Sequence, residues 1–345
     1  MIWRHGDRAP ERVFDGIKLS KDSFPNGLGN LTQLGKLQVE LFAEKIKKRY
    51  FSDDDMRDRK VLIRSTQVPR TIESANIIAS VLRLPNTSVT SNVNLKIDTE
   101  GNPFYVCPTV EEYVEKVRNS YRMVNKYKDV YSLIEEKVNY TGDVHPVLDL
   151  LHCMNSHNIP TPEWSHNSTL IWILKYLSWN GLAARYGLKP YLNMTQNKLT
   201  GRQIDSGAVL KGVVDKLKSA VECDRELEND DCDVYFSGLS AHDITIAALF
   251  STFPNYEKIL SSVPFVEYVA NVAFEVWRLP NRKYAIKAFY ANSFREEPTD
   301  ITEYLPGCEN YEFCPFNDFI ETTQSLYYED VNYLYQQCQL GKGSL

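Results

Sequence analysis

The sequence lacks a long apolar run and a surplus of positive charge. Because a membrane-spanning helix needs about 18 or more consecutive apolar residues, the first absence excludes such a helix. The 39 Lys and Arg residues are outnumbered by 45 Asp and Glu residues, which leaves a net charge of −6. Bulk electrostatics therefore attract neither nucleic acid nor an anionic membrane surface, and any anion must be bound by a local group of basic residues.

Length and composition indicate one compact protein with a large core. Apolar residues make up 43% of the 345 residues, and aromatic residues make up 12%. Strand-like runs followed by helical patterns occupy residues 1–92 and 200–345, whereas prolines separate helical stretches between residues 93 and 199. We therefore expect an α/β core formed by residues 1–92 and 200–345, into which a mostly helical cap at residues 93–199 is inserted.

Two elements of the core are outlined by the sequence pattern. A helix is expected over residues 31–50, with Asn30 as its N-cap. The apolar face of this helix is expected to carry Leu34, Leu37, Leu41 and Ile46. Residues 272–277 and 284–290 have the pattern of an antiparallel hairpin, turned at residues 280–282.

The most informative motif is R-H-G-D-R-A-P at residues 4–10, in which His5 lies between Arg4 and Arg8. Two guanidiniums beside an imidazole disfavour its protonation, so we expect His5 to be a neutral nucleophile below its usual pKa of about 6.5. The planar guanidinium forks also match phosphate oxygens bidentately. Gly6 lets the backbone turn sharply and approach a ligand closely. Taken alone, the motif also fits a surface turn with scattered charge.

Two distant segments favour the phosphate-site interpretation. His242 and Asp243 lie between a strand-like run at residues 233–238 and a helical run at residues 244–250. Arg70 lies between a strand-like run at residues 61–63 and the helical run that follows it. Anionic ligands gather where strands end and helices begin, so these residues are expected to join the first motif in one site.

Together these segments resemble the histidine acid phosphatase family, and within it the branch of animal prostatic and lysosomal acid phosphatases. Residues 4–10 fit the family signature R-H-G-x-R-x-P, residues 242–243 fit its H-D pair, and residues 64–71 resemble its R-S-T/S-x-x-x-R-T segment. The resemblance extends from residue 1 to about residue 338. It implies a phosphoglycerate-mutase-like fold, in which helices flank a central mixed sheet and a mostly helical cap is inserted.

The resemblance also implies an enzyme that hydrolyses phosphate monoesters without a metal or another cofactor. His5 would attack phosphorus and form a phosphohistidine, and Asp243 would protonate the leaving alcohol. The oxygens of the phosphate would be held by four basic side chains, Arg4, Arg8, Arg70 and His242. A nearby phosphate charge is expected to raise the pKa of Asp243, which predicts an activity optimum on the acid side of neutrality.

The sequence departs from the family pattern at three places. Gln67 and Pro69 stand where acidic residues are frequent, but neither position is a phosphate ligand. Only three residues precede Arg4, whereas family members have a longer central strand there and secreted members have a signal peptide. We therefore expect the sequence to be truncated upstream. Its polar end at residues 341–345 is also expected to lack the C-terminal membrane anchor of some lysosomal relatives.

Seven cysteines together with several N-x-S/T sequons indicate an oxidising compartment. We therefore expect a secreted or lysosomal protein. The resemblance implies disulfides between Cys107 and Cys338 and between Cys308 and Cys314. The second pair is also favoured by its short spacing and by the Gly and Pro of its segment.

The other three cysteines leave alternatives open. Cys223 and Cys232 flank an acidic loop and are predicted to bond to each other, which leaves Cys153 as the odd thiol. A bond from Cys153 to Cys223 or to Cys232 is the rival assignment.

Five sequons are candidate glycosylation sites, at Asn30, Asn86, Asn139, Asn167 and Asn193. We expect at least two of them to carry glycans. Three of the five fall between residues 139 and 193, which suits an exposed subdomain.

The insert contains two groups of residues that could suggest a ligand site. Its four histidines, His145, His152, His157 and His166, fit no common metal motif, so we expect ordinary loop and surface residues and no metal site. Its aromatic residues Trp164, Trp172, Tyr176 and Trp179 are expected to form its core. By resemblance the insert borders the mouth of the active site, and some of its residues would select substrates.

Two other functions are compatible with parts of this pattern. A non-catalytic secreted glycoprotein on the same fold is disfavoured because every catalytic residue of the family is present. A phytase or inositol-phosphate phosphatase shares the first motif; the H-D pair favours general phosphate monoesters and leaves phytate open as a substrate. Animal relatives commonly dimerise, so the resemblance suggests a homodimer.

Overall fold

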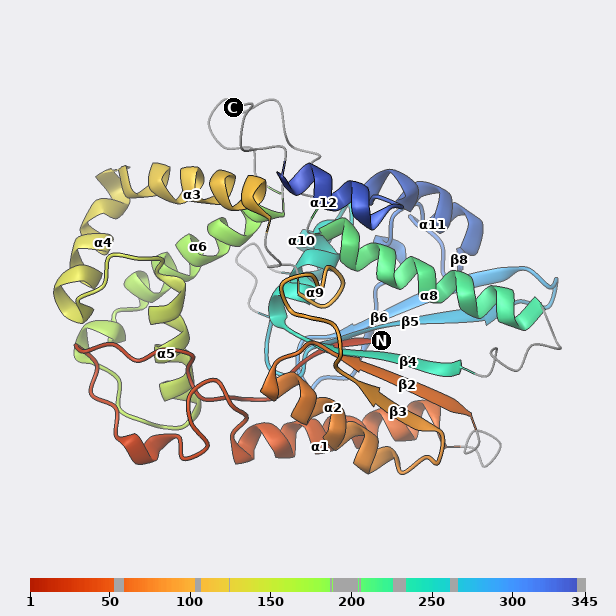
Figure 1. The fold of residues 1–345 in the computed structure, drawn as a ribbon, viewed down its shortest axis with the longest axis horizontal. Coiled ribbons are helices and arrows are strands. Elements are labelled where there is room, and N and C mark those ends of the chain that lie inside the picture. The colour runs from red at the N-terminus through yellow and green to blue at the C-terminus, as the bar shows by residue number, and fades with distance from the viewer. Residues whose placement is uncertain are drawn as a thin grey trace.

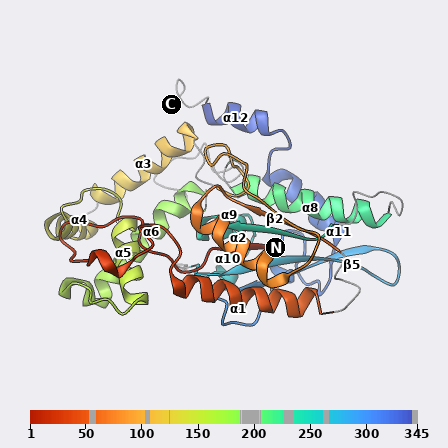
Figure 2. The ribbon, with the colours of Figure 1, turned by 60° about the horizontal axis from the view of Figure 1, so that its bottom comes forward.

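The computed structural model describes residues 1–52, 59–102, 107–123, 125–186, 188, 204, 206–225, 234–260 and 266–339. A sheet flanked by helices forms one side of the molecule, and a group of helices forms the other side (Figure 1). Figure 2, turned by 60°, shows the same separation of α3 to α6 from the sheet.

The sheet has eight strands and contains both parallel and antiparallel pairs. Along the sheet the order is β3-β2-β4-β1-β5-β6-β7, and β8 pairs with β6. The pairs β1–β4, β4–β2 and β2–β3 are parallel, while β5 is antiparallel to β1. The strands are β1 (Ile2–Arg4), β2 (Lys60–Ser65), β3 (Thr87–Thr90), β4 (Val234–Ala241), β5 (Asn271–Arg278), β6 (Tyr284–Ala291), β7 (Thr299–Asp300) and β8 (Cys314–Pro315).

Strand β1 is short but lies in the middle of the sheet. Ile2 and Trp3 are 5% and 0% exposed, and alternation along the strand places them on opposite faces. Trp3 packs over Gly238 of β4, where a Cβ atom would overlap its ring. The absence of a side chain at Gly238 therefore lets the largest residue of β1 lie flat against the neighbouring strand.

Helices cover both faces of the sheet. One face, with Trp3, packs against α1 (Gln33–Tyr50) and α2 (Pro69–Leu82). The other face, with Ile2, packs against α8 (Gly207–Arg225), α9 (Asp243–Ser251) and α11 (Phe316–Thr323). The remaining elements of the core side are α10 (Tyr256–Ile259), α12 (Val331–Gln339), η6 (Thr302–Tyr304) and η7 (Gln324–Leu326). The short η1 (Lys21–Ser23) lies beside the cap, where the next residue, Phe24, packs against His157. This arrangement confirms the predicted mixed sheet between helices.

The prediction for the first helix was wrong in two details. Helix α1 begins at Gln33, and its N-cap is Thr32, whose hydroxyl accepts a hydrogen bond from the Gly35 N–H. Leu37 and Leu41 are 51% and 47% exposed. The buried face instead consists of Gly35, Gln38, Val39, Phe42, Ala43 and Ile46. The helix thus has two apolar stripes, and the one with Val39 and Phe42 packs against α2 and the sheet. The spacing of the leucines alone did not indicate this choice.

The cap helices are α3 (Pro108–Met123), α4 (Asn125–Val138), α5 (His145–Ser156), the short η3 (Glu163–His166) and α6 (Ser168–Arg185). They surround an apolar cluster of their own that includes Leu150, Met154 and Leu174. Phe14 and Ile17, from the segment after the first motif, also belong to this cluster. These contacts support the division that we propose, a core of residues 1–92 and 200–345 and a cap of residues 93–199. Residues 189–203 lie outside the described part of the chain.

Two disulfides join described cysteines. Cys107, just before α3, is bonded to Cys338 in α12, and Cys308 is bonded to Cys314. Cys153 is a buried free thiol. Cys223 is disulfide-bonded, but its expected partner at position 232 lies outside the described residues. The Cys107–Cys338 bond ties the beginning of the cap to the C-terminal helix of the core.

Across the ranges given above, we find no helix whose length and apolar content would let it cross a membrane.

The hairpin prediction is confirmed, since β5 and β6 pair antiparallel from Asn271↔Ala291 to Arg278↔Tyr284.

Candidate active site

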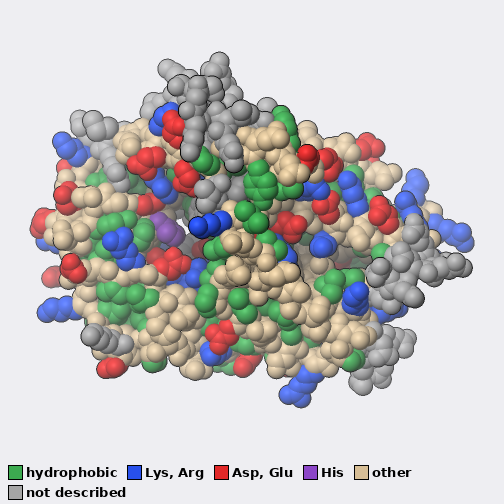
Figure 3. Space-filling model, viewed as in Figure 1, with side chains coloured by type: hydrophobic (Ala, Val, Ile, Leu, Met, Phe, Trp, Pro, Cys, Tyr) green, Lys and Arg blue, Asp and Glu red, His purple; other side chains and the backbone are tan. Residues whose placement is uncertain are grey.

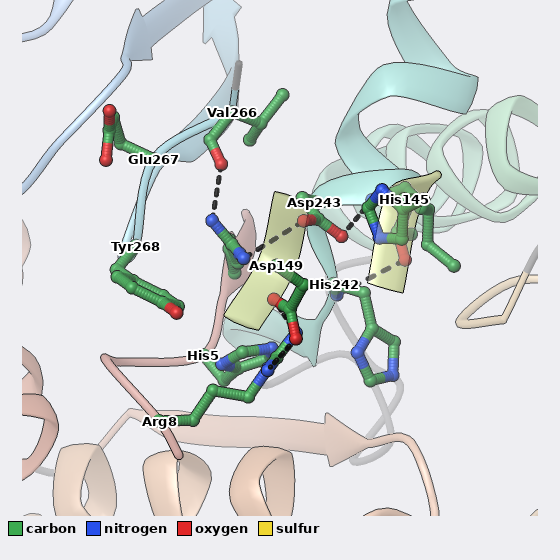
Figure 4. Close-up of polar contacts among 12 residues, drawn as sticks. His5, Arg8, His145, Asp149, His242, Asp243, Val266, Glu267 and Tyr268 are labelled. Atoms are coloured by element: carbon green, nitrogen blue, oxygen red, sulfur yellow. Dashed lines mark hydrogen bonds and ion pairs between the residues drawn. The ribbon is translucent and has the colours of Figure 1, made fainter. Parts of the chain in front are cut away.

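The candidate site lies where three parallel strands end and two helices begin. In the sheet Arg4 pairs with Ala241, and Ser65 pairs with Ser240. His5 and His242 each follow directly after these strand ends, and their rings lie side by side with centroids 5.7 Å apart. Figure 4 shows both histidines close to Arg8 and Asp243. The structure thus brings together all six residues predicted for the site.

His5 presents an unprotonated nitrogen to the site. Its Nδ1 lies 2.8 Å from the Gly6 carbonyl oxygen, which only accepts hydrogen bonds, so Nδ1 carries the hydrogen. Its Nε2 accepts a hydrogen bond of 3.0 Å from Arg70 Nε. Burial and then the charges of Arg70 and Arg4 hold the pKa of His5 well below its usual value. The predicted neutral imidazole is confirmed, with burial as the larger cause.

Each of the three arginines expected to bind phosphate, Arg4, Arg8 and Arg70, is paired with a carboxylate. Arg4 contacts Asp243 at 3.0 Å. Arg8 donates two hydrogen bonds to Asp149, at 3.0 and 2.9 Å, in a bidentate pair. A phosphate entering the site must therefore replace or share these carboxylate contacts.

The third arginine is held at the N-terminus of α2. Arg70 Nη2 bonds the exposed Glu11 carboxylate at 2.7 Å. Pro69 is the first residue of α2, where a missing backbone N–H costs the helix nothing. This departure from the family pattern therefore leaves Arg70 in the first turn, facing His5.

The segment of residues 266–270, which we call the strap, contacts both Arg4 and His5 and holds them in place. Arg4 donates a 2.6 Å hydrogen bond to the Val266 carbonyl, and its guanidinium stacks 4.2 Å from the centre of the Tyr268 ring. The Val269 N–H donates to the His5 carbonyl at 3.2 Å. Val269 has a φ of 61°, which a β-branched residue rarely adopts. Sequence reasoning missed this strap, because nothing in the residue pattern marks it.

A chain of hydroxyl groups sets the tautomer of His242. Thr71 donates its single hydroxyl hydrogen to the backbone carbonyls of Thr66 and Val68. The Thr66 hydroxyl therefore donates to Thr71 Oγ1, 2.7 Å away, and acts as an acceptor toward His242 Nε2 at 3.0 Å. His242 consequently carries its hydrogen on Nε2, as a neutral donor. Burial and then the charge of Arg70 lower its pKa to about 3.

Asp243 is ionised in the ligand-free site. Its Oδ2 contacts Arg4, and its Oδ1 accepts a 2.8 Å hydrogen bond from the Ile244 N–H at the start of α9. Burial raises the pKa of Asp243, but Arg4, His145 and other positive groups outweigh burial and bring it to about 2. A proton-donating Asp243 therefore requires a bound anion that offsets these positive charges.

The loop after His5 is clamped between α1 and the cap. The buried Asp7 carboxylate accepts hydrogen bonds from the Thr32 hydroxyl at 2.5 Å and from His157 Nε2 at 2.6 Å. The Asp7 N–H donates to Gln38 Oε1 at 2.8 Å. A Cβ atom on Gly6 would overlap the Gly35 carbonyl, so Gly6 is required for contact with α1. The predicted close approach of Gly6 is therefore to a neighbouring helix.

The sequence predicted that the insert histidines are ordinary loop and surface residues, but this is not true of all four. His157 binds Asp7, and His145 and His152 line a pocket with Arg4 and Asp243. His145 and His166 are exposed, whereas His152 and His157 are half-buried. In the described ranges no group of three or more His, Cys, Asp or Glu side chains could hold a metal ion. Trp164 and Tyr176 pack, partly buried, against the apolar cluster of the cap, as predicted. Trp179 is buried in the cluster of the sheet side instead, and Trp172 is 51% exposed and stacks on Tyr176.

Three functional candidates escaped the sequence analysis. Asp149 binds Arg8, Glu11 binds Arg70, and Tyr268 packs against Arg4 and His5. Glu11 is next to the first motif and could have been examined for that reason. Asp149 and Tyr268 lie far from any motif, and no local pattern distinguishes them.

Comparison with known proteins agrees with this geometry. The family described as the histidine phosphatase superfamily (branch 2) matches residues 1–291. The chain therefore belongs to this family. Bovine prostatic acid phosphatase is 27% identical over 96% of this chain and 85% of its own length. Bovine lysosomal acid phosphatase is 25% identical over 99% of this chain and 80% of its own length.

Solved structures show the same fold. The apo form of Hafnia alvei phytase matches with a TM-score of 0.66 at 13% identity, covering 98% of this chain and 97% of its own. Bifidobacterium longum multiple inositol polyphosphate phosphatase in complex with inositol hexasulfate matches with a TM-score of 0.62 at 10% identity, covering 96% and 92%. The chain is a phosphatase that hydrolyses phosphate monoesters, on the histidine phosphatase fold.

Proposed function

We propose that this protein is an acid phosphatase that works through a phosphohistidine on His5, with Asp243 as the proton donor. The observation that carries the proposal is the unprotonated Nε2 of His5, directed into a site that contains three guanidiniums. These cations supply the charge that phosphoryl transfer requires, so we expect turnover without an added metal.

In the first step His5 Nε2 forms a bond to phosphorus, and the bond from phosphorus to the leaving oxygen breaks. Asp243 gives its proton to that oxygen, which leaves as the alcohol. In the second step water attacks phosphorus, the carboxylate of Asp243 takes a proton from the water, and the phosphorus–nitrogen bond breaks. Arg4, Arg8 and Arg70 would bind the three non-bridging oxygens. His242 would be a further donor if its Nε2–H exchanged the Thr66 hydroxyl, which it contacts in the ligand-free site, for a phosphate oxygen.

The charges around Asp243 suggest why this reaction prefers acid. The pKa of Asp243 is about 2 without ligand, because Arg4 and its neighbours overcome the effect of burial. A bound phosphate offsets those positive charges and raises the pKa of Asp243. A substrate that arrives as the monoanion at acid pH also brings the proton that Asp243 must deliver.

Hydrolysis of para-nitrophenyl phosphate between pH 4 and 9 tests the proposal. We expect turnover with an acid optimum, unchanged by EDTA, and a loss of at least about 10⁴-fold in His5→Ala. A folded wild type without turnover would favour the non-catalytic alternative. An optimum above pH 8 would contradict Asp243 as proton donor.

The phytase alternative shares the fold, but the pocket fits the substrate of a phytase less well. Six of the thirteen residues that line the pocket beside Arg4 and Asp243 are apolar, and apolar atoms provide most of its exposed surface, which suits an organic leaving group better than a ring of phosphates. Release of phosphate from phytate, measured beside phenyl phosphate, separates the two activities.

Localisation and assembly are further parts of the proposal. We propose a secreted or lysosomal glycoprotein, because the sequon residues Asn86, Asn139 and Asn167 are exposed. Asn30 is half-exposed, and Asn193 lies outside the described residues. A fall in mass after glycosidase treatment is the expected result. We also propose a homodimer, whose mass light scattering would measure. No nucleic acid or membrane partner is expected.

A further inference from the structure

The pocket beside the phosphate site continues well past the catalytic residues. Arg4 and Asp243 line its inner end. The leaving oxygen of the substrate, which would receive the proton of Asp243, would therefore lie at this end. The empty space of the pocket, counted together with the open solvent at its mouth, amounts to about 730 Å³. Figure 3 shows His, Lys or Arg, and Asp or Glu side chains around the hollow between the cap and the core. A group held there is therefore the alcohol part of the substrate.

The walls of this pocket are mostly apolar. They are formed by Leu148, Trp179, Leu182, Ile244, Ala247 and Val266. Trp179 is 4% exposed, and the neighbouring residues of the cap and of α9 hold it in place. Such walls favour a ring or a short hydrocarbon chain as the leaving group.

The outer end of the pocket carries a single lysine. Lys175, Trp179 and Leu182 are spaced i, i+4 and i+7 on α6, so they share one face of the helix. Lys175 therefore lies about 10 Å along the helix axis from Leu182. At the inner end the carboxylates are already engaged, Asp243 by Arg4 and Asp149 by Arg8.

The titratable groups around Lys175 come from two elements, α5 and the strap. His152 of α5 is neutral, since burial and then the charge of Arg4 lower its pKa to about 4. His145 of α5 shares a 2.8 Å hydrogen bond with Ser178 Oγ. Glu267 of the strap is partly buried; burial raises its pKa, and the charges of Arg4 and Lys175 act in the opposite direction. Lys175 is thus the cation that the outer pocket offers, and Glu267 is the carboxylate that competes for it.

We propose that Lys175 determines specificity, and that this pocket takes an aryl or alkyl leaving group which carries a carboxylate. The inference rests on the proposed function, because the pocket receives the leaving group only if Asp243 protonates the leaving oxygen. The hydrocarbon part fills the apolar walls, and the carboxylate pairs with the Lys175 ammonium at the mouth.

The test compares phenyl phosphate with 4-carboxyphenyl phosphate. For each enzyme the ratio of the two kcat/KM values is measured, and comparison of these ratios between enzymes cancels the intrinsic reactivity of the substrates. We expect the preference for the carboxylated substrate to fall about fivefold in Lys175→Gln, as for a solvent-exposed ion pair. Lys137→Gln, which removes the same charge from an exposed cap lysine bonded to Glu136, leaves the ratio unchanged.

Two further variants make the result specific. Lys175→Arg keeps the charge and retains the preference, whereas Glu267→Gln removes the competing carboxylate and increases it. An unchanged ratio in Lys175→Gln, or an equal fall in Lys137→Gln, overturns the inference while phenyl phosphate turnover still supports the phosphatase. Wild-type enzyme that hydrolyses neither substrate overturns the proposed function and this inference together.

Discussion

The core side of the active site and its cap side contribute different things to the same pocket. The core supplies the groups proposed to react with phosphate, His5, Arg4, Arg70, His242 and Asp243, all placed at strand ends or helix N-termini. The cap supplies Asp149, which holds Arg8, and His157, which holds Asp7. The cap also lines the leaving-group pocket with Lys175 and Trp179. In our proposal the core performs the chemistry, while the cap positions Arg8 and selects the substrate.

Removal of the proton donor from the core is expected to have the largest effect. Asp243→Asn lowers kcat/KM, which reports the phosphorylation step, about 10²–10⁴-fold on an alkyl phosphate, whose alkoxide leaves slowly without a proton. With para-nitrophenyl phosphate the loss is much smaller, because that leaving group needs little protonation. Equal losses on the two substrates, measured by steady-state kinetics, would show that Asp243 does not act as the acid.

Breaking the covalent tie between the two sides is expected to cost stability more than activity. The double change Cys107→Ser and Cys338→Ser opens a bond that spans 231 residues of sequence. We expect the free energy of unfolding in urea to fall by about 2–5 kcal/mol. Removal of the Cys308–Cys314 bond, with a separation of six residues, costs less because it closes a short loop. The reverse order would contradict a tie between cap and core.

The cap carboxylate under Arg8 gives a sharper form of the comparison. Asp149→Asn leaves Arg8 buried without its bidentate partner, and the free energy of unfolding falls by about 2–4 kcal/mol. Inorganic phosphate restores part of the loss, because its oxygens pair with Arg8. Thermal melts with and without phosphate measure both effects. Equal phosphate shifts in the variant and the wild type would argue against this pairing.

A buried histidine of the cap makes stability depend on pH. The pKa of His152 is about 4, lowered first by burial, so between pH 6.5 and 4 the unfolded chain binds more protons than the folded one. Stability therefore falls as the pH falls through this window, by at most about 1.4 kcal/mol per pH unit. His152→Asn is expected to flatten the slope of unfolding free energy between pH 7 and 5. An unaltered slope would contradict this assignment.

The smallest effect is expected at the exposed carboxylate on Arg70. Glu11 bonds Arg70 at 2.7 Å and lies 4.0 Å from Arg8, where a phosphate oxygen would bind. Glu11→Gln removes this competitor and lowers KM for para-nitrophenyl phosphate about threefold, with kcat unchanged. A higher KM would mean that Glu11 helps to place Arg70 for the substrate.

The comparison also explains what the sequence could reveal. His5, Arg4 and Arg8 stand in one short motif, and His242 and Asp243 stand in another, because a strand end and the following turn are contiguous in the chain. Asp149, Lys175 and Tyr268 reach the site through tertiary packing of separate elements, which no local pattern encodes. The buried face of α1 was missed for a similar reason, since the sheet selected Val39 and Phe42 over Leu37 and Leu41.

The most direct test of the account is to trap the phosphorylated enzyme. Wild type and Asp243→Asn are mixed with a slowly leaving alkyl phosphate and with para-nitrophenyl phosphate, and the reaction is quenched within milliseconds. Peptide mass analysis under alkaline conditions then locates the phosphate. The account predicts phosphate on His5 Nε2, formed by both enzymes from para-nitrophenyl phosphate and by the wild type alone at an appreciable rate from the alkyl ester. Turnover without any phosphohistidine, or with phosphate on another residue, would contradict it.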